Sequence, residues 1–274
     1  MRNVPDDNSI LPMKKSCRHL TLITIGIFCS TFAALPLAEA AMIVVPNFVT
    51  ATEGGGGNLL PFDIGEDITD VPGQTQRYQQ VYNALQFAAL DQTGGFITEI
   101  RFRPDRSSGE AFSSTLPQIR IDLSTTSAAE GTLSTTFASN TGLDAMIVYG
   151  GATGSSLALS SAFNGPVHGP KDFDIVITLT TPFFYNPALG NLLMDVRNFG
   201  GGITTTFDSA NESDDGTSRI LTTSSGVNSA VANSADATGL VTAFTTVLVP
   251  EPSGVLMLAG PGLTLLFRRC RQRR

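Results

Sequence analysis

Five oxygen-bearing side chains lie close together in the sequence and could coordinate a metal ion. They are Asp208, Asn211, Glu212, Asp214 and Asp215. Carboxylate and amide oxygens are the ligands that Ca²⁺ prefers, so this stretch is a candidate calcium loop. The spacing is not that of an EF-hand, because counting from Asn211 puts Thr222 where a bidentate glutamate is required. We expect a solvated acidic loop, with Ca²⁺ as the alternative and no other cofactor.

Carboxyl groups are also the main candidates for catalysis. Glycoside hydrolysis needs two of them, one on each side of the sugar bond. The nominal candidates are Glu99, Asp122, Asp172, Asp174 and Asp195. Their places in alternating segments predict outward-facing, solvated groups instead. We therefore expect no catalytic residues, and polysaccharide hydrolysis is the least favoured function.

Other catalytic machinery lacks the residue types that it needs. The body of the chain contains one histidine, His168, in a loop rich in glycine and proline, so a multi-histidine metal site is excluded. A Gly-x-Ser-x-Gly nucleophile elbow is absent from the sequence, and the body has no cysteine. These observations predict a protein that is not an enzyme.

Sugar binding through aromatic stacking is weakly supported. The chain has no tryptophan and four tyrosines: Tyr78, Tyr82, Tyr149 and Tyr185. We expect these rings to pack in the core and in turns. A lectin that binds sugar through acidic and amide groups around calcium remains the alternative.

The elements that must position these residues follow a period of two. Residues 118–124 place Ile119, Ile121 and Leu123 on one face and polar side chains on the other, which predicts a half-buried strand. Residues 172–180 repeat the pattern, and weaker versions occur at 98–103, 192–199 and 240–248; residues 78–87 fit a strand or a short helix. The segment 204–246, rich in Ser, Thr, Asn and Gly, is expected to be exposed. Gly-Gly and Gly-Pro pairs separate the segments. The pattern predicts an all-β, antiparallel, jelly-roll-like β-sandwich.

The charge and cysteine content of the body limit its partners. Residues 42–249 contain 20 acidic and 8 basic side chains, a net charge of −12, which argues against nucleic acid as a partner. The three cysteines, Cys17, Cys29 and Cys270, lie near the two chain ends. The body must therefore fold without disulfides, and we expect a single domain over residues 42–248.

The N-terminal region has the layout of a secretory signal. Basic residues after Met13 precede an apolar stretch over residues 20–37, and Ala38-Glu39-Ala40 fits the small-residue pattern that signal peptidase accepts. Residues 1–41 are thus expected to form an extension and a signal peptide, with Met13 as an alternative start. This predicts export across the inner membrane.

The C-terminal region, residues 249–274, has a second sorting layout. Pro250-Glu251-Pro252 precedes an apolar run over residues 254–267. As a helix this run reaches about 21 Å, less than the roughly 30 Å hydrocarbon core of a bilayer, so it would be a short transmembrane tether. The basic residues that flank it would lie on the cytoplasmic side. They are Arg268, Arg269, Arg271, Arg273 and Arg274.

The Pro-Glu-Pro triplet, short apolar helix and arginine cluster resemble the PEP-CTERM tail found in exopolysaccharide-producing Gram-negative bacteria. The resemblance covers about one tenth of the chain, and Pro261 and Cys270 depart from it without disturbing the triplet. It implies an exosortase substrate in which residues 250–252 are the recognition motif. The expected destination is the cell surface or the extracellular biofilm matrix, after transient tethering. The expected role is structural or adhesive, with exopolysaccharide binding as the alternative.

Overall fold

The computed structural model describes residues 40–65, 75–90, 93–222 and 225–248. The predicted sorting tail and nearly all of the predicted N-terminal extension and signal peptide lie outside these ranges. Within them, no helix is both long enough and apolar enough to cross a membrane. The structural findings below therefore concern the body of the chain.

The described chain consists of β-strands joined by loops and four short 3-10 helices, and every strand pairing is antiparallel. The strands are β1 (Ala40–Val45), β2 (Gly55–Asn58), β3 (Gln76–Tyr82), β4 (Gly95–Phe102), β5 (Phe112–Thr126), β6 (Met146–Tyr149), β7 (Ser155–Ser161), β8 (Ile175–Tyr185), β9 (Asn191–Asn198), β10 (Phe207–Ala210), β11 (Thr217–Leu221), β12 (Ser234–Asp236), β13 (Gly239–Leu240) and β14 (Thr242–Leu248). The 3-10 helices are η1 (Asn47–Val49), η2 (Ala84–Leu90), η3 (Phe137–Ser139) and η4 (Pro187–Leu189). The all-β, antiparallel prediction is confirmed.

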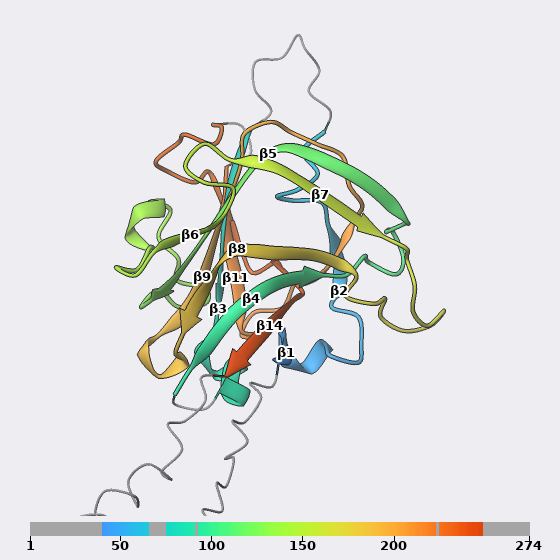
Figure 1. The fold of residues 1–274 in the computed structure, drawn as a ribbon, viewed down its shortest axis with the longest axis horizontal. Coiled ribbons are helices and arrows are strands. Elements are labelled where there is room, and N and C mark those ends of the chain that lie inside the picture. Colours follow the sequence, from blue (N-terminus) through green and yellow to red (C-terminus); the bar gives the residue numbers. More distant parts are fainter. Residues whose placement is uncertain (1–39, 66–74, 91–92, 223–224, 249–274) are drawn as a thin grey trace, which may run out of the picture. The chain divides into compact units, whose positions relative to one another are not determined.

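The strands form three sheets. The four-stranded sheet has the order β1-β14-β4-β8, and Figure 1 shows these strands side by side. The seven-stranded sheet has the order β12-β11-β3-β9-β5-β6, with β7 also paired to β5, and the small sheet has the order β13-β10-β2. The chain crosses between the two larger sheets several times, because β4 and β8 of the four-stranded sheet each lie in the sequence between strands of the seven-stranded sheet.

One hydrophobic core joins the two larger sheets. Ile100 and Phe244 from the four-stranded sheet belong to the same buried cluster as Tyr78, Ile121 and Val196 from the seven-stranded sheet. Each large apolar side chain buried there contributes about 1.5–3 kcal/mol. The period-two pattern therefore succeeded where one face of a strand meets this core, and Ile119, Ile121 and Leu123 are buried as predicted.

Several boundaries differ from the sequence prediction. The strand expected from residue 172 begins at Ile175, because Asp172 and Asp174 lie in a loop where the Asp174 carboxylate accepts a hydrogen bond from Ala162 N–H. Residues 78–87 contain both predicted alternatives, the end of β3 and the start of η2. The expectation that the segment 204–246 is exposed was wrong in its first half, because β10 and most of β11 are buried.

Candidate functional site

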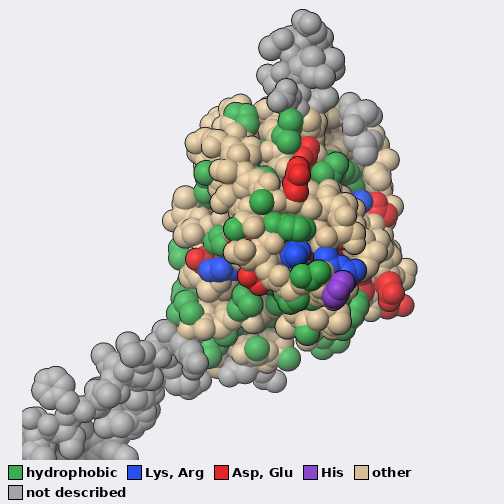
Figure 2. All heavy atoms as spheres, turned by 90° about the vertical axis from the view of Figure 1, so that its right-hand side faces the viewer, with side chains coloured by type: hydrophobic (Ala, Val, Ile, Leu, Met, Phe, Trp, Pro, Cys, Tyr) green, Lys and Arg blue, Asp and Glu red, His purple; other side chains and the backbone are tan. Residues whose placement is uncertain are grey.

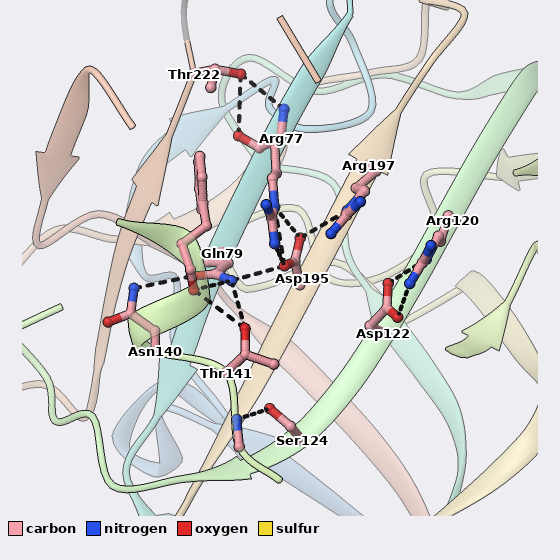
Figure 3. A network of polar contacts seen from close by, with 12 residues as sticks. Arg77, Gln79, Arg120, Asp122, Ser124, Asn140, Thr141, Asp195, Arg197 and Thr222 are labelled. Atoms are coloured by element: carbon pink, nitrogen blue, oxygen red, sulfur yellow. Dashed lines mark hydrogen bonds and ion pairs between the residues drawn. The ribbon is translucent and has the colours of Figure 1, made fainter. Parts of the chain in front are cut away.

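Charged side chains gather on the outer face of the seven-stranded sheet. Its three central strands, β3, β9 and β5, alternate core residues with residues that point away from the core. The outward-facing residues are Arg77 and Gln79 on β3, Asp195 and Arg197 on β9, and Arg120, Asp122 and Ser124 on β5. Figure 3 shows Arg77, Gln79 and Arg197 around Asp195, with the separate Arg120–Asp122 pair on the neighbouring strand.

Three arginines lie in register across these strands. Arg197 is the cross-strand partner of Arg77 on β3 and of Arg120 on β5. We call Arg77, Arg197 and Arg120 the arginine row. Like charges directly opposite one another destabilise a sheet, so the row is a cost to the fold. The row also contains three of the eight basic residues in a body with net charge −12.

Two carboxylates neutralise two of the three arginines. Arg120 donates from Nε to Asp122 Oδ2 at 2.7 Å and from one terminal nitrogen to Oδ1 at 2.7 Å. Those hydrogen bonds raise the pKa of Arg120 further. Arg77 donates from Nε to Asp195 Oδ1 at 3.1 Å and from a terminal nitrogen to Oδ2 at 2.5 Å. Both arginines are thus held in two-pronged ion pairs.

Arg197 is the incompletely paired member of the row. Its Nε lies 3.9 Å from Asp195 Oδ1, beyond hydrogen-bond distance, and this buried atom has no hydrogen-bond partner among the described residues. Burial, and then the positive charge of Arg77, lowers the pKa of Arg197. The side chain still reaches solvent, with 26% of its surface exposed. Arg197 therefore has a carboxylate nearby but no hydrogen bond from its Nε to any described residue.

The arginine row opens into a groove of about 640 Å³. Its floor contains the row with Asp122 and Asp195, and its wall contains Ala138 and Thr141, from the segment that crosses the sheet between β5 and β6. That segment is fixed to the floor by Gln79, whose amide nitrogen donates to Phe137 O at 3.2 Å and to Asp195 Oδ2 at 2.8 Å. The volume is in the range of about 300–1,000 Å³ that is typical of small-molecule sites.

The five nominal catalytic carboxylates have different surroundings. Asp122 and Asp195 are cross-strand partners in the groove. The strand position of Asp195 predicted a solvated side chain, but this side chain is buried. Its burial follows from the crossing segment and from Arg77, which sequence periodicity does not reveal. Glu99 lies on β4, in the other large sheet, where Arg101 binds it. Asp172 and Asp174 are in the loop before β8.

Burial, which raises the pKa of a carboxyl group, is outweighed at Glu99 by two partners. Thr245 donates to its Oε2 at 2.8 Å and Arg101 Nε does so at 3.0 Å, and the pKa of Glu99 is lowered.

His168 lies in the loop between β7 and β8, as predicted, and its side chain is exposed. Figure 2 shows basic side chains beside the histidine across the middle of one face, with acidic side chains scattered around them.

The five predicted calcium ligands do not form one cluster. Asp208 lies on β10 and is fully buried against Arg103, while Asp215 accepts hydrogen bonds from the backbone and hydroxyl of Thr217. Asn211, Glu212 and Asp214 are exposed in the turn between β10 and β11. The acidic side chains that approach within metal-binding distance of one another, in the described part of the chain, are Glu53, Asp105 and Asp208. Arg103 already supplies positive charge there.

The tyrosines are mainly core residues. Tyr78, Tyr82 and Tyr185 are buried, and burial raises the pKa of Tyr78 to about 12. Tyr149 is half-buried, and its hydroxyl donates to Ser156 O at 2.6 Å. The tyrosines thus pack as expected and do not form an exposed stacking surface in the described residues.

The arginine row was not predicted from the sequence, although the sequence contains a local signal for it. Arg120-Ile121-Asp122 and Asp195-Val196-Arg197 each place an arginine and an aspartate two residues apart on the polar face of a strand. Their alignment depends on strand register, which local sequence does not give.

The predicted sorting residues, Pro250, Glu251, Pro252 and the five terminal arginines, lie outside the described residues. Comparison of the chain with models of known protein families and with curated proteins found no match.

Proposed function

We propose that this chain is an exported, non-enzymatic protein of the cell surface or extracellular matrix, with a structural or adhesive role. The main supporting observation is the pairing of its first and last strands. β1 pairs with β14 along its whole length, from Ala40 opposite Val247 to Val45 opposite Thr242. The two ends of the body, Ala40 and Leu248, therefore lie side by side at the same end of one sheet.

This arrangement suits processing at both ends. Cleavage after the predicted signal motif, which ends at Ala40, would remove at most the first residue of β1. β14 ends at Leu248, just before the Pro-Glu-Pro triplet that begins at Pro250. Signal peptidase and an exosortase could each cut without disrupting the sheets. The proposed path is export, transient tethering by the C-terminal helix, and release to the surface or matrix.

The body that would be delivered is proposed to be a jelly-roll-like β-sandwich. Support comes from the core shared by the two larger sheets and from the repeated crossing of the chain between them, at β4 and at β8. The four-stranded sheet also joins the first strand of the body to the last. A closed body of this kind needs no disulfide, which suits a segment without cysteines.

The non-enzymatic role is supported by the ion pairs of the two carboxylates in the groove. A glycosidase of the usual kind requires one carboxyl group to carry a proton as general acid. An arginine partner that binds both oxygens of a carboxyl group instead occupies that group in an ion pair. Asp122 and Asp195 each have such a partner, Arg120 and Arg77 respectively.

Carbohydrate binding is the second candidate function. The observation that favours it is the groove above the arginine row, whose size fits a small molecule and whose floor has an incompletely paired arginine. Exopolysaccharide is the proposed partner, and nucleic acid is not, because the body as a whole is strongly acidic.

Sorting is tested by changing the central residue of the triplet in the producing cell. The Glu251→Ala variant should accumulate, uncleaved, in the inner membrane, whereas the unchanged protein should be released. Immunoblotting of membrane and extracellular fractions with an antibody to the body measures this difference. Glu212→Ala, at an exposed turn of the body, is the matched control and should be released normally. Normal release of the Glu251 variant would refute exosortase processing.

A further inference from the structure

We propose that the groove above the arginine row binds an oxyanion carried by a saccharide, such as a uronate carboxylate or a sulfate ester, with Arg197 as the principal ligand. This inference deepens the proposed surface role, because it names the ligand class of an exported matrix protein. Three guanidinium groups face two carboxylates in the row, so the floor carries one excess positive charge.

The geometry identifies which arginine is available. Arg77 and Arg120 each use Nε and a terminal nitrogen on an aspartate. Arg197 has neither contact at hydrogen-bond distance among the described residues, and its Nε is buried without an acceptor. A buried donor without an acceptor is unfavourable for the fold, and a guanidinium can donate two parallel hydrogen bonds to a carboxylate or to a sulfate ester. An oxyanion at the exposed part of the Arg197 side chain would bring it a negative charge and relieve the repulsion within the row.

The fold maintains this arrangement at a cost. Arg197 faces an arginine on both sides, and its lowered pKa reflects burial and the charge of Arg77. Replacing Arg197 by a neutral residue would remove repulsion without breaking a strong hydrogen bond. A residue whose removal should stabilise the fold is typical of binding sites rather than of structural ones.

The chemistry of the groove selects among ligands. A cation would meet three guanidinium groups and two carboxylates that are already paired, so an anion is favoured. The wall beside the row contains small side chains, among them Ala138, Thr141 and Ala145, which leave the groove open for a ring attached to the anionic group. Recognition must be local, because the body as a whole repels a polyanion. Binding should therefore weaken as salt screens the contact.

The test measures binding to the full-length chain, purified in a neutral detergent, by calorimetry. The probes are oligogalacturonate, heparin-derived oligosaccharide, neutral dextran and sodium sulfate. We expect an acidic saccharide to bind. Whichever of oligogalacturonate and the heparin-derived oligosaccharide binds more tightly identifies the anionic group. Arg197→Gln should weaken that binding at least tenfold, and Arg197→Lys should weaken it less, because lysine keeps the charge but loses the two-pronged geometry.

The matched control is Arg101→Gln on β4, which changes an arginine paired with Glu99 on the other large sheet. It should bind the saccharide as the unchanged protein does. Thermal melting separates binding from folding, since Arg197→Gln should melt at the same or a higher temperature. The proposal would be overturned if the Arg197 variants bound the acidic saccharide as tightly as the unchanged protein does, or if dextran bound as tightly as the acidic saccharide. Binding of sulfate alone, or no binding at all, would also overturn it.

A reducing-end measurement on the same samples distinguishes this inference from the proposed function. New reducing ends would reveal hydrolysis of the saccharide, and would overturn the non-enzymatic role while leaving saccharide binding intact. Absence of binding would leave export and sorting standing, because these are measured in cells with the Glu251 variant.

Discussion

Arg103 and Asp208 form a completely buried ion pair: Arg103 Nε donates to Asp208 Oδ2 at 2.7 Å, and neither side chain is exposed. The same guanidinium donates to the carbonyl oxygens of Val49 and Thr52, and its carbon lies 4.9 Å from the centre of the Phe173 ring. One side chain thus ties β4, β10, the loop after β1 and the loop before β8 together. The sequence predicted Asp208 as a possible calcium ligand. In the structure, Asp208 instead pairs with Arg103 and helps to hold these segments together.

Removing one partner of this pair should strongly destabilise the body. Asp208→Ala leaves a buried guanidinium without its counter-charge, and such changes cost about 3–5 kcal/mol. The double variant Arg103→Met/Asp208→Leu should lose much less, because no charge remains buried. Urea denaturation of the full-length chain measures both free energies of unfolding.

A partly exposed pair provides the matched control. Arg219 and Asp236 are 2.8 Å apart, with 11% of the Arg219 side chain and 37% of the Asp236 side chain exposed, whereas the Arg103–Asp208 pair is completely buried. Asp236→Ala should therefore cost less than Asp208→Ala, because solvent reaches the charges of this pair. A loss at Asp236 as large as that at Asp208 would contradict the importance of burial.

Stability should fall as the pH rises from mildly acidic to mildly alkaline. Burial, and then the charge of Asp208, raises the pKa of Glu53, and burial raises the pKa of Asp215 despite hydrogen bonds from Thr217. A carboxyl group with a raised pKa in the folded state contributes stability that is fully present below its unfolded pKa and is lost as the pH passes its folded pKa. The Tm at about pH 5 should exceed the Tm at about pH 8.

Glu53→Gln should flatten this dependence and raise the Tm on the alkaline side, because it removes one of the carboxyl groups whose pKa burial raises, a set that also includes Asp215 and Asp208. Differential scanning calorimetry across the pH range measures the slope. The matched control is Glu110→Gln, at an exposed position, which should leave the slope unchanged. An unchanged slope in the Glu53 variant would show that other groups govern the pH dependence.

The sequence predicted strand faces well and their surroundings poorly. Ile119, Ile121 and Leu123 were correctly assigned to the core because a strand that meets one core shows a period of two. Asp195 was assigned to solvent by the same rule, yet Arg77 and Gln79, more than a hundred residues away along the chain, bury and bind it. Local periodicity identifies which residues share a face but not what covers that face.

Composition was misleading for a related physical reason. The segment around β10 is rich in serine, threonine and aspartate, which suggested exposure, but Asp208 and Ser209 are fully buried. Asp208 is stabilised there by Arg103, and Gly54 N–H also donates to it at 3.0 Å. A polar side chain can be buried when a distant partner satisfies it, and this partner lies 105 residues away. The arginine row was missed for the same reason, because strand register created it.

The turn between β6 and β7 should be far more sensitive at Gly150 than at Gly151. Both residues have positive φ, 86° and 64°, which costs a residue with a Cβ about 1 kcal/mol or more. At Gly150 a Cβ would also collide with the carbonyl oxygen of Ile119, whereas at Gly151 it would meet nothing within 4 Å. Gly150→Ala should therefore lose about 3 kcal/mol and Gly151→Ala about 1 kcal/mol. Thermal denaturation of the two variants measures the difference, and equal losses would mean that φ alone decides it.

The attachment of the last strand to the core should depend mainly on Phe244. Its ring is fully buried on β14, 5.0 Å from the Tyr82 ring in an edge-to-face arrangement and 5.5 Å from the Phe87 ring. Phe244→Ala should destabilise the body by about 3–5 kcal/mol, because it removes a large core side chain. Since β14 pairs with β1, the loss should also expose the N-terminal edge to protease.

Phe96 is the matched control, because it lies on β4, the neighbour of β14, but faces outward with 40% of its surface exposed. It contacts Phe184 with ring centres 5.4 Å apart, and such a pair contributes only about 0.5–1.5 kcal/mol beyond burial. Phe96→Ala should therefore leave protease resistance nearly unchanged. If the Phe244 variant resists protease as the Phe96 variant does, β14 must be held by backbone pairing with β1 and β4 rather than by its aromatic anchor, and the proposed processing just after Leu248 would not depend on that ring.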